Sequence, residues 1–189
     1  MTGIVGVVIA FVLMLLSDLF KLRNKGRKGA MLLIAGMTLL VVSLAIAAFS
    51  GERFEVALLL RTLAFLVAGI ALVMEVTALF LSLPARETYL LVEKMHLQDK
   101  GMYALCRHPA ALCLPALLLS LAVGLGSGGL LRAGALASFL NFMYVWIQDR
   151  YIFPRTIPGY HDYQKRVPFL LPTPVSIKAA IATRKAKQG

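Results

Sequence analysis

The chain has 189 residues, of which 59% are hydrophobic and 15% charged, and its mean hydropathy is +0.79. This composition excludes a soluble domain of average make-up. The formal net charge of +11 would favour nucleic-acid binding in a soluble protein, but the basic residues lie beside long apolar runs. We therefore expect a lipid bilayer as partner, and no nucleic acid.

Five apolar segments follow one another along the chain. They cover residues 3–20, 30–50, 56–83, 110–125 and 130–147. Lipid offers no hydrogen-bond partner to open strands, so each is expected to be a helix. The first segment lacks the basic start and the cleavage site of a signal peptide, so we interpret it as a membrane span. The third is long enough to tilt or protrude, and the fourth is short for a full crossing. The predicted fold is an all-α integral membrane helical bundle of about five transmembrane helices.

Lys and Arg concentrate in alternate connections between these segments. They lie at 21–28, at 86–107 and in the tail from residue 150, whereas Arg53 stands in a connection of the opposite set. Because cytoplasmic loops retain basic residues, the N-terminus is predicted outside and the C-terminal tail in the cytoplasm. Three regions follow: N-terminal membrane helices (1–83), a region bearing the candidate site (84–172) and a basic tail (173–189).

The most informative polar residues stand at two helix ends. Arg107 and His108 precede Pro109, which is expected to begin a helix. The first N–H groups of that helix, near Ala110 and Ala111, would be free. Together with the Arg107 and His108 side chains, these N–H groups would suit a carboxylate. At the end of the fifth segment stand Gln148 and Asp149, and Asp149 would suit an ammonium group or ribose hydroxyls. A helical hairpin with a four-residue turn would bring both ends to one membrane face. Either pair alone is equally typical of a membrane-boundary anchor or a salt bridge.

Other residues were weighed for chemistry. Glu75 lies inside the third apolar segment, where an ionisable side chain is a candidate for function. The three histidines and two cysteines have no metal-ligand spacing, so no metal site is expected. Cys106 and Cys113 are interpreted as packing residues.

The C-terminal half carries a combination of motifs. It reads Gly101-x-Tyr103-x-x-x-Arg107-His108-Pro109, an apolar hairpin, Gln148-Asp149, and then Tyr160-x-x-Tyr163-x-x-Arg166-Val167-Pro168-Phe169-Leu170-Leu171-Pro172. This order, over residues 101–172, resembles the superfamily of isoprenylcysteine carboxyl methyltransferases and phospholipid methyltransferases. Two features depart from the pattern: Ala111 stands where the family usually has Tyr, and Gln148-Asp149 stands where it usually has a Glu-Glu pair. Asp149 still supplies a carboxylate, whereas Gln148 does not.

The resemblance implies a membrane enzyme that uses S-adenosylmethionine and methylates a lipid-like or lipidated acceptor. The residues expected to bind the cofactor are Tyr103, Arg107, His108, Pro109, Gln148, Asp149, Tyr160 and Tyr163. For catalysis we expect Arg166, Asp149 and, from its membrane depth, Glu75. The favoured reaction is carboxyl O-methylation of a prenyl- or acyl-bearing acceptor. The alternatives are a phospholipid N-methyltransferase, a nicotinamide-dependent membrane reductase of related architecture, and a non-catalytic membrane subunit.

Overall fold

The structure is a computed structural model that describes residues 2–23, 26–81 and 97–185. Its elements are α1 (Thr2–Leu22), α2 (Gly26–Phe49), α3 (Leu58–Val76), η1 (Thr77–Leu81), α4 (Met102–Leu105), α5 (Pro109–Leu125), α6 (Gly128–Ile147), η3 (Gln148–Ile152), α7 (Phe153–Thr156), α8 (Tyr160–Arg166) and α9 (Pro174–Lys185). The described residues form no β-strand, and the one extended pairing among them is an isolated bridge between Arg53 and Ser127. The predicted all-α class is confirmed.

Four helical stretches are long and apolar enough to cross a membrane. They are Gly3–Leu22, Arg27–Phe49, Leu58–Leu81 and Gly128–Thr156. The apolar helix α5 has 17 residues, which at about 1.5 Å per residue gives roughly 26 Å, a little less than the hydrocarbon core. The expectation that the fourth segment is short is therefore confirmed, and the fold is compatible with a membrane bundle.

Small residues let α1 and α2 pack closely. A side chain at Gly6 would collide with Ser43, and a Cβ at Gly36 would lie 2.8 Å from Met14 Cγ. Close approach through small residues is a common way for helices to associate in lipid, where apolar burial alone gives no preference for a neighbour. Near the other end of this pair, the buried Ser17 hydroxyl donates a 2.7 Å hydrogen bond to the Gly29 carbonyl. The pair then packs as one unit against α6.

The hairpin of α5 and α6 turns at residues 126 and 127. Gly126 ends α5 in the left-handed conformation (φ 60°), and the Ser127 hydroxyl caps α6 by accepting a hydrogen bond from Leu130 N–H. The α2–α3 connection docks on this turn, because Phe54 N–H donates to Gly126 O and Gly128 N–H donates to Glu52 O, both at 2.9 Å. The predicted hairpin is confirmed, and its tip is fixed to the rest of the bundle.

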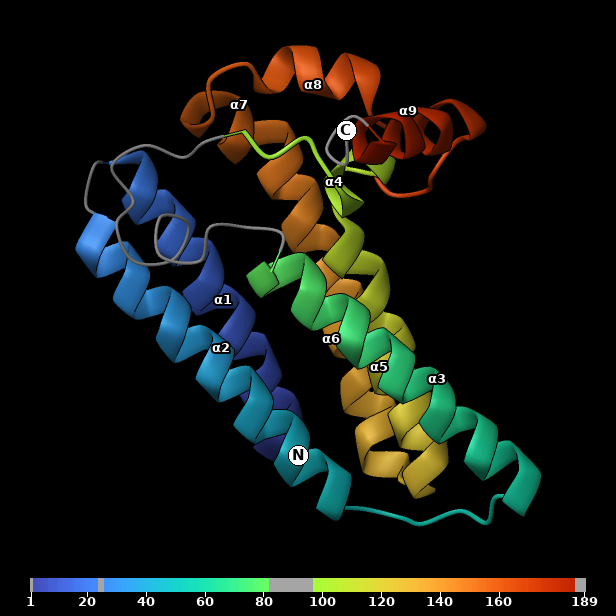
Figure 1. Cartoon of the computed structure of the whole chain (residues 1–189). Helices are drawn as coiled ribbons and strands as arrows, with labels where there is room; N and C mark the ends of the chain where they lie inside the picture. The colour runs from blue at the N-terminus through green and yellow to red at the C-terminus, as the bar shows by residue number, and fades with distance from the viewer. Residues whose placement is uncertain (1, 24–25, 82–96, 186–189) are drawn as a thin grey trace.

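Figure 1 shows how the helices are arranged. α3 packs against α5, whereas α2 packs against α1 and α6. The short helices α4, α7, α8 and α9 gather at one end of the bundle, and α1 begins near the opposite end. Of the predicted 84–109 connection, residues 84–96 lie outside the described part of the chain.

Candidate functional site

Arg107 and Asp149 form a buried ion pair at the end of the α5–α6 hairpin. Arg107 Nε donates to Asp149 Oδ1 at 2.7 Å and Nη2 donates to Oδ2 at 2.9 Å. Both side chains are nearly buried, with 10% and 11% of their surfaces exposed. The predicted meeting of the two helix ends is confirmed. The sequence predicts that these two charges hold opposite ends of a cofactor, but in the structure they pair with each other.

Further side chains complete the shell around the Asp149 carboxylate. Tyr160 Oη donates to Oδ1 at 2.7 Å, and His108 Nε2 lies 3.3 Å from the same oxygen. Gln164 Nε2 donates to the Asp149 carbonyl at 2.8 Å and lies 3.2 Å from Oδ2. Arg107 Nη1 in turn donates to the Gln164 and Val167 carbonyls. We call these five residues (Arg107, His108, Asp149, Tyr160 and Gln164) the Asp149 cluster.

Local backbone structure places this cluster. Pro109 occupies the first turn of α5, where its missing N–H is no loss, and His108 is the residue just before it. Asp149 lies in η3, a π-helical turn; such turns insert an extra residue and frequently mark functional sites. The expected anion site at the start of α5 has one donor fewer than predicted, because Ala111 N–H donates to His108 O at 3.1 Å.

The C-terminal Val-Pro-Phe segment closes over the motif. Arg107 N–H donates to Pro168 O at 2.9 Å, and His108 N–H lies 3.3 Å from Phe169 O. The His108 ring stacks on Phe153, with centroids 5.7 Å apart, and meets Phe169 edge to face. Two parts of the motif about sixty residues apart are thus joined by backbone and ring contacts.

Burial sets the protonation of the cluster. Loss of water lowers the pKa of His108 despite the opposing carboxylate of Asp149. Burial, followed by its bond to Asp149, raises the pKa of Tyr160 well above its usual range. Near pH 7 His108 is therefore neutral and Tyr160 keeps its proton as a donor to Asp149.

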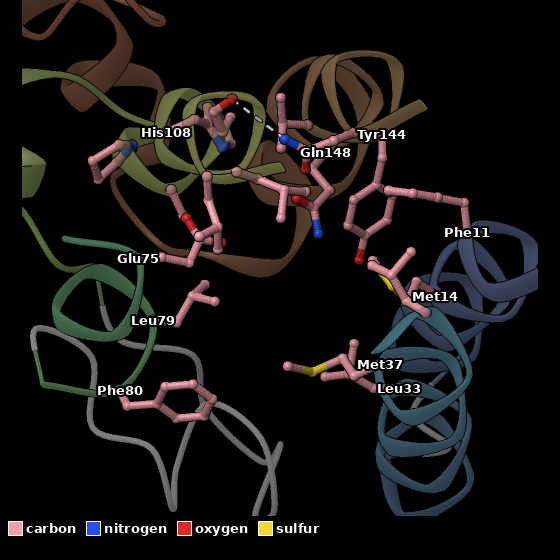
Figure 2. Close-up of a pocket in the computed structure, with 18 of the residues that line it drawn as sticks. Phe11, Met14, Leu33, Met37, Glu75, Leu79, Phe80, His108, Tyr144 and Gln148 are labelled. Carbon is pink, nitrogen blue, oxygen red and sulfur yellow. Dashed lines mark hydrogen bonds between the residues drawn. The ribbon is translucent and has the colours of Figure 1, made fainter. Parts of the chain in front are cut away.

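A cavity of about 710 Å³ adjoins the cluster. Seven of the eight residues predicted to bind a cofactor line it: Tyr103, Arg107, His108, Pro109, Gln148, Tyr160 and Tyr163. Asp149 stands behind Arg107 and is not among the lining residues in the described part of the chain. Figure 2 shows residues from several helices around the cavity, with Phe11 and Met14 of α1 and Met37 of α2 across from His108 and Glu75.

A second polar group on this wall involves Asp18 of α1. Its Oδ2 accepts 2.8 Å hydrogen bonds from Tyr144 Oη and Gln148 Nε2, and its Oδ1 lies 3.4 Å from Lys21 Nζ. Gln148 therefore joins α6 to α1 instead of binding beside Asp149. Sequence reasoning missed Asp18, although an acidic residue inside an apolar span is itself a signal of function or pairing.

Glu75 of α3 lies on the cavity wall, and its predicted role in catalysis stays a prediction. Its Oε2 is buried and has no hydrogen-bond partner among the described residues. This sets it apart from Asp18 and Asp149, whose oxygens are engaged by several donors.

The structure does not bring Arg166 to the cluster. Its side chain is 62% exposed, and its Nη2 lies 3.8 Å from Asp99 Oδ2. It borders a separate small pocket beside α9. Its catalytic role stays a prediction without support from this placement. The described residues hold no group of three His, Cys, Asp or Glu side chains able to bind a metal ion.

Comparison with known proteins gives no relative: no protein-family model, curated protein or solved structure matches this chain.

Proposed function

We propose that this chain is an integral membrane methyltransferase that uses S-adenosylmethionine and acts on a lipid-like acceptor. The proposal is carried by one observation: residues of the motif that resembles the methyltransferase superfamily, drawn from α4, α5, η3 and α8, line one cavity. The volume of that cavity lies within the range of ligand pockets, roughly 300–1,000 Å³.

The residues present fit such a cofactor in kind. Tyr160, Tyr163 and Phe153 offer aromatic rings on the cavity wall, which suit the flat base of a nucleoside. When bound, the cofactor supplies a methyl group on a cationic sulfur, which passes to the acceptor's nucleophile as the sulfur leaves in a neutral thioether. Because Arg107 and Asp149 are paired, their proposed role is to position His108 and Tyr160.

The chain's own contribution would be alignment and exclusion of water. Displacement at a methyl carbon needs an acceptor held in line, and little acid–base chemistry if the nucleophile is a carboxylate. The deep end of the cavity is closed by buried groups, and its walls are mostly apolar. Such a site favours an amphiphilic acceptor over a water-soluble one.

Residues of α2 and α3 that line the cavity are also exposed in the described part of the chain, which supports entry of the acceptor from lipid between these helices. Val41 of α2 and Leu72 and Val76 of α3 line the cavity, and they are also 67%, 50% and 41% exposed. Each methylene buried from such an acceptor contributes about 0.8 kcal/mol. Long-chain acceptors should therefore be used much more efficiently than short-chain versions with the same headgroup. Equal efficiency would contradict lateral entry.

In this proposal α5 crosses the membrane together with the four longer helical stretches, which gives five transmembrane helices, and the site faces the cytoplasm. Lys21, Arg23 and Arg155 lie at the cluster's end of the bundle, in the positive-inside sense. A membrane-impermeant thiol reagent should label a cysteine placed at the exposed Glu55, in the α2–α3 connection, from outside the cell, and not one placed at the exposed Lys178 on α9. Labelling only at position 178 would reverse the orientation.

Cofactor binding tests the function directly. Purified protein in nanodiscs should bind S-adenosylmethionine and S-adenosylhomocysteine but not NADPH, and His108→Ala should weaken that binding. His161→Ala, which changes an exposed histidine on α8, is the matched control and should bind normally. Binding of NADPH alone would favour the reductase alternative and refute the proposal, as would binding of none of the three.

A further inference from the structure

The charged groups around the cavity do not balance. Lys21 is paired with Asp18, and Arg107 is paired with Asp149. Glu75 remains, with one buried carboxylate oxygen that no described residue engages. His108 is neutral near pH 7, so it contributes no compensating cation. With Asp149 behind Arg107 counted in, an ionised Glu75 therefore gives the described groups in and behind the cavity wall a surplus of one negative charge.

An unsatisfied carboxylate here is unfavourable for the fold. The cavity wall near it is apolar: Leu72 and Leu79 lie one helical turn before and after Glu75 on the same side of the α3–η1 stretch. Burial of a polar group without a partner destabilises a protein, whereas an apolar residue of similar size would not. Figure 2 shows the Glu75 side chain beside Leu79, within the ring of residues around the cavity and not outside it. The missing partner is thus best supplied by something that enters the cavity.

We propose that Glu75 is the counter-ion for the cationic head of an amine-bearing amphiphile. This inference deepens the proposed function, and it rests on that function for the identification of the ligand as the methyl acceptor. For transfer, the ammonium head first gives one N–H proton to the Glu75 carboxylate, and the lone pair of the resulting amine forms the new N–C bond as the S–C bond to the thioether breaks. Leu72 and Val76, close to Glu75 on α3, line the cavity and are also exposed among the described residues. A head at Glu75 therefore leaves its tail directed past these residues towards lipid.

The same geometry disfavours the carboxylate acceptor expected from the sequence. A carboxylate beside Glu75 would place two like charges in apolar surroundings, and the two cations that the described residues place on the cavity wall, Lys21 and Arg107, are already held by Asp18 and Asp149. Charge complementarity therefore selects an ammonium head over an anionic one, with Glu75 as the residue that determines specificity.

Binding of matched single-chain probes tests this proposal. Dodecylammonium, dodecanol and dodecanoate compete for the full-length protein in a neutral detergent, without cofactor, against a fluorescent twelve-carbon probe. The wild type should prefer dodecylammonium over dodecanol by roughly ten- to a hundred-fold, the value of a charge-assisted hydrogen bond. Glu75→Gln should abolish this preference while leaving dodecanol affinity unchanged, which shows that the cavity is intact.

Two controls separate the specific effect from general attraction of cations. Glu55→Gln removes an equivalent charge from an exposed site in the α2–α3 connection, and it should keep the full preference. Without ligand, Glu75→Gln should melt at a temperature no lower than the wild type. A clear drop in its melting temperature would show that the chain itself supplies a partner for Glu75, which overturns the proposal. The proposal is also overturned if Glu75→Gln keeps the preference for dodecylammonium, or if the wild type binds dodecanoate more strongly than dodecylammonium.

Failure of the proposed function gives a different pattern. If S-adenosylmethionine does not bind but the Glu75-dependent preference for dodecylammonium persists, the cationic-head site stands and methyl transfer falls. If Glu75→Gln weakens only S-adenosylmethionine binding and the preference is unchanged, Glu75 is the counter-ion of the cofactor and this inference falls.

Discussion

Two buried carboxylates beside the same cavity differ in how they are satisfied. Asp149 accepts hydrogen bonds from Arg107, Tyr160 and Gln164 and lies within reach of His108. Glu75 has a buried oxygen that no described donor reaches. The first arrangement is typical of a group that holds a scaffold together, and the second of a group kept for a ligand. The contrast teaches that motif residues and ligand-binding residues need not coincide.

The largest effect on stability should come from removing the Asp149 carboxylate, because several donors are hydrogen-bonded to it. Asp149→Ala leaves Arg107 buried without its partner, which should lower the free energy of unfolding by about 3–5 kcal/mol. Thermal and denaturant unfolding in detergent measure this. The matched control is Asp162→Ala, which breaks an exposed pair with Lys165 at 2.9 Å and should have no measurable effect. If Asp149→Ala and Asp162→Ala both change the free energy of unfolding only slightly, Asp149 does not hold the scaffold together.

Asp18 extends the comparison to a third carboxylate. Asp18→Ala removes the acceptor for Tyr144 and Gln148 and leaves Lys21 unpaired, so we expect a loss of about 2 kcal/mol in the free energy of unfolding. The loss should be smaller than for Asp149, because the long Lys21 side chain can extend towards the membrane surface. Asp18→Asn, which keeps an acceptor oxygen, should recover part of it. Full stability of Asp18→Ala would show that α1 is held by apolar packing alone.

Protonation of His108 sharpens the account of the Asp149 cluster. Burial lowers the pKa of His108 in the folded protein, so below about pH 6.5 the unfolded chain binds more protons than the folded one. Stability should therefore be lost as pH falls from about 6.5 towards the folded pKa, by no more than about 1.4 kcal/mol per pH unit. Unfolding curves between pH 8 and 5 measure the slope. His108→Gln should flatten it, whereas His161→Gln should not; identical slopes in all three proteins would place the titration elsewhere.

The smallest expected change in the free energy of unfolding is an increase. Glu75→Leu removes the unsatisfied carboxylate and should raise the free energy of unfolding by about 1 kcal/mol. The same unfolding assay applies, and Glu55→Leu at an exposed site is the control. A destabilised Glu75→Leu protein would mean that Glu75 belongs with Asp18 and Asp149 as a structural group.

The long helices and their hairpin were within reach of sequence reasoning, because apolar runs and a short Gly-rich turn leave few alternatives. The partners of individual polar groups were not. Which neighbour Gln148 meets depends on the rotation of its helix, and η3 shifts that rotation in a way that regular helical spacing does not predict. Gln148 therefore reaches Asp18 on α1 while Asp149 reaches Arg107.

Tyr160 and Arg166 show the same limit within one short helix. Both belong to the C-terminal motif, yet Tyr160 is buried against Asp149 and Arg166 faces outward. The motif spacing alone could not separate them, because the side of α8 that packs on the bundle is decided by tertiary contacts.

The bond between Asp18 and Tyr144 sets an order for biogenesis. The two residues are 126 positions apart, and at a synthesis rate of about 5–20 residues per second this is a delay of roughly 6–25 s. During that interval α1 has been made but the hydroxyl and amide donors that later engage its carboxylate have not. Lys21, three positions away, is the one member of the final Asp18 group that is present from the start. The newly synthesised α1 thus carries, in Lys21, a temporary partner for the Asp18 carboxylate until α6 is made.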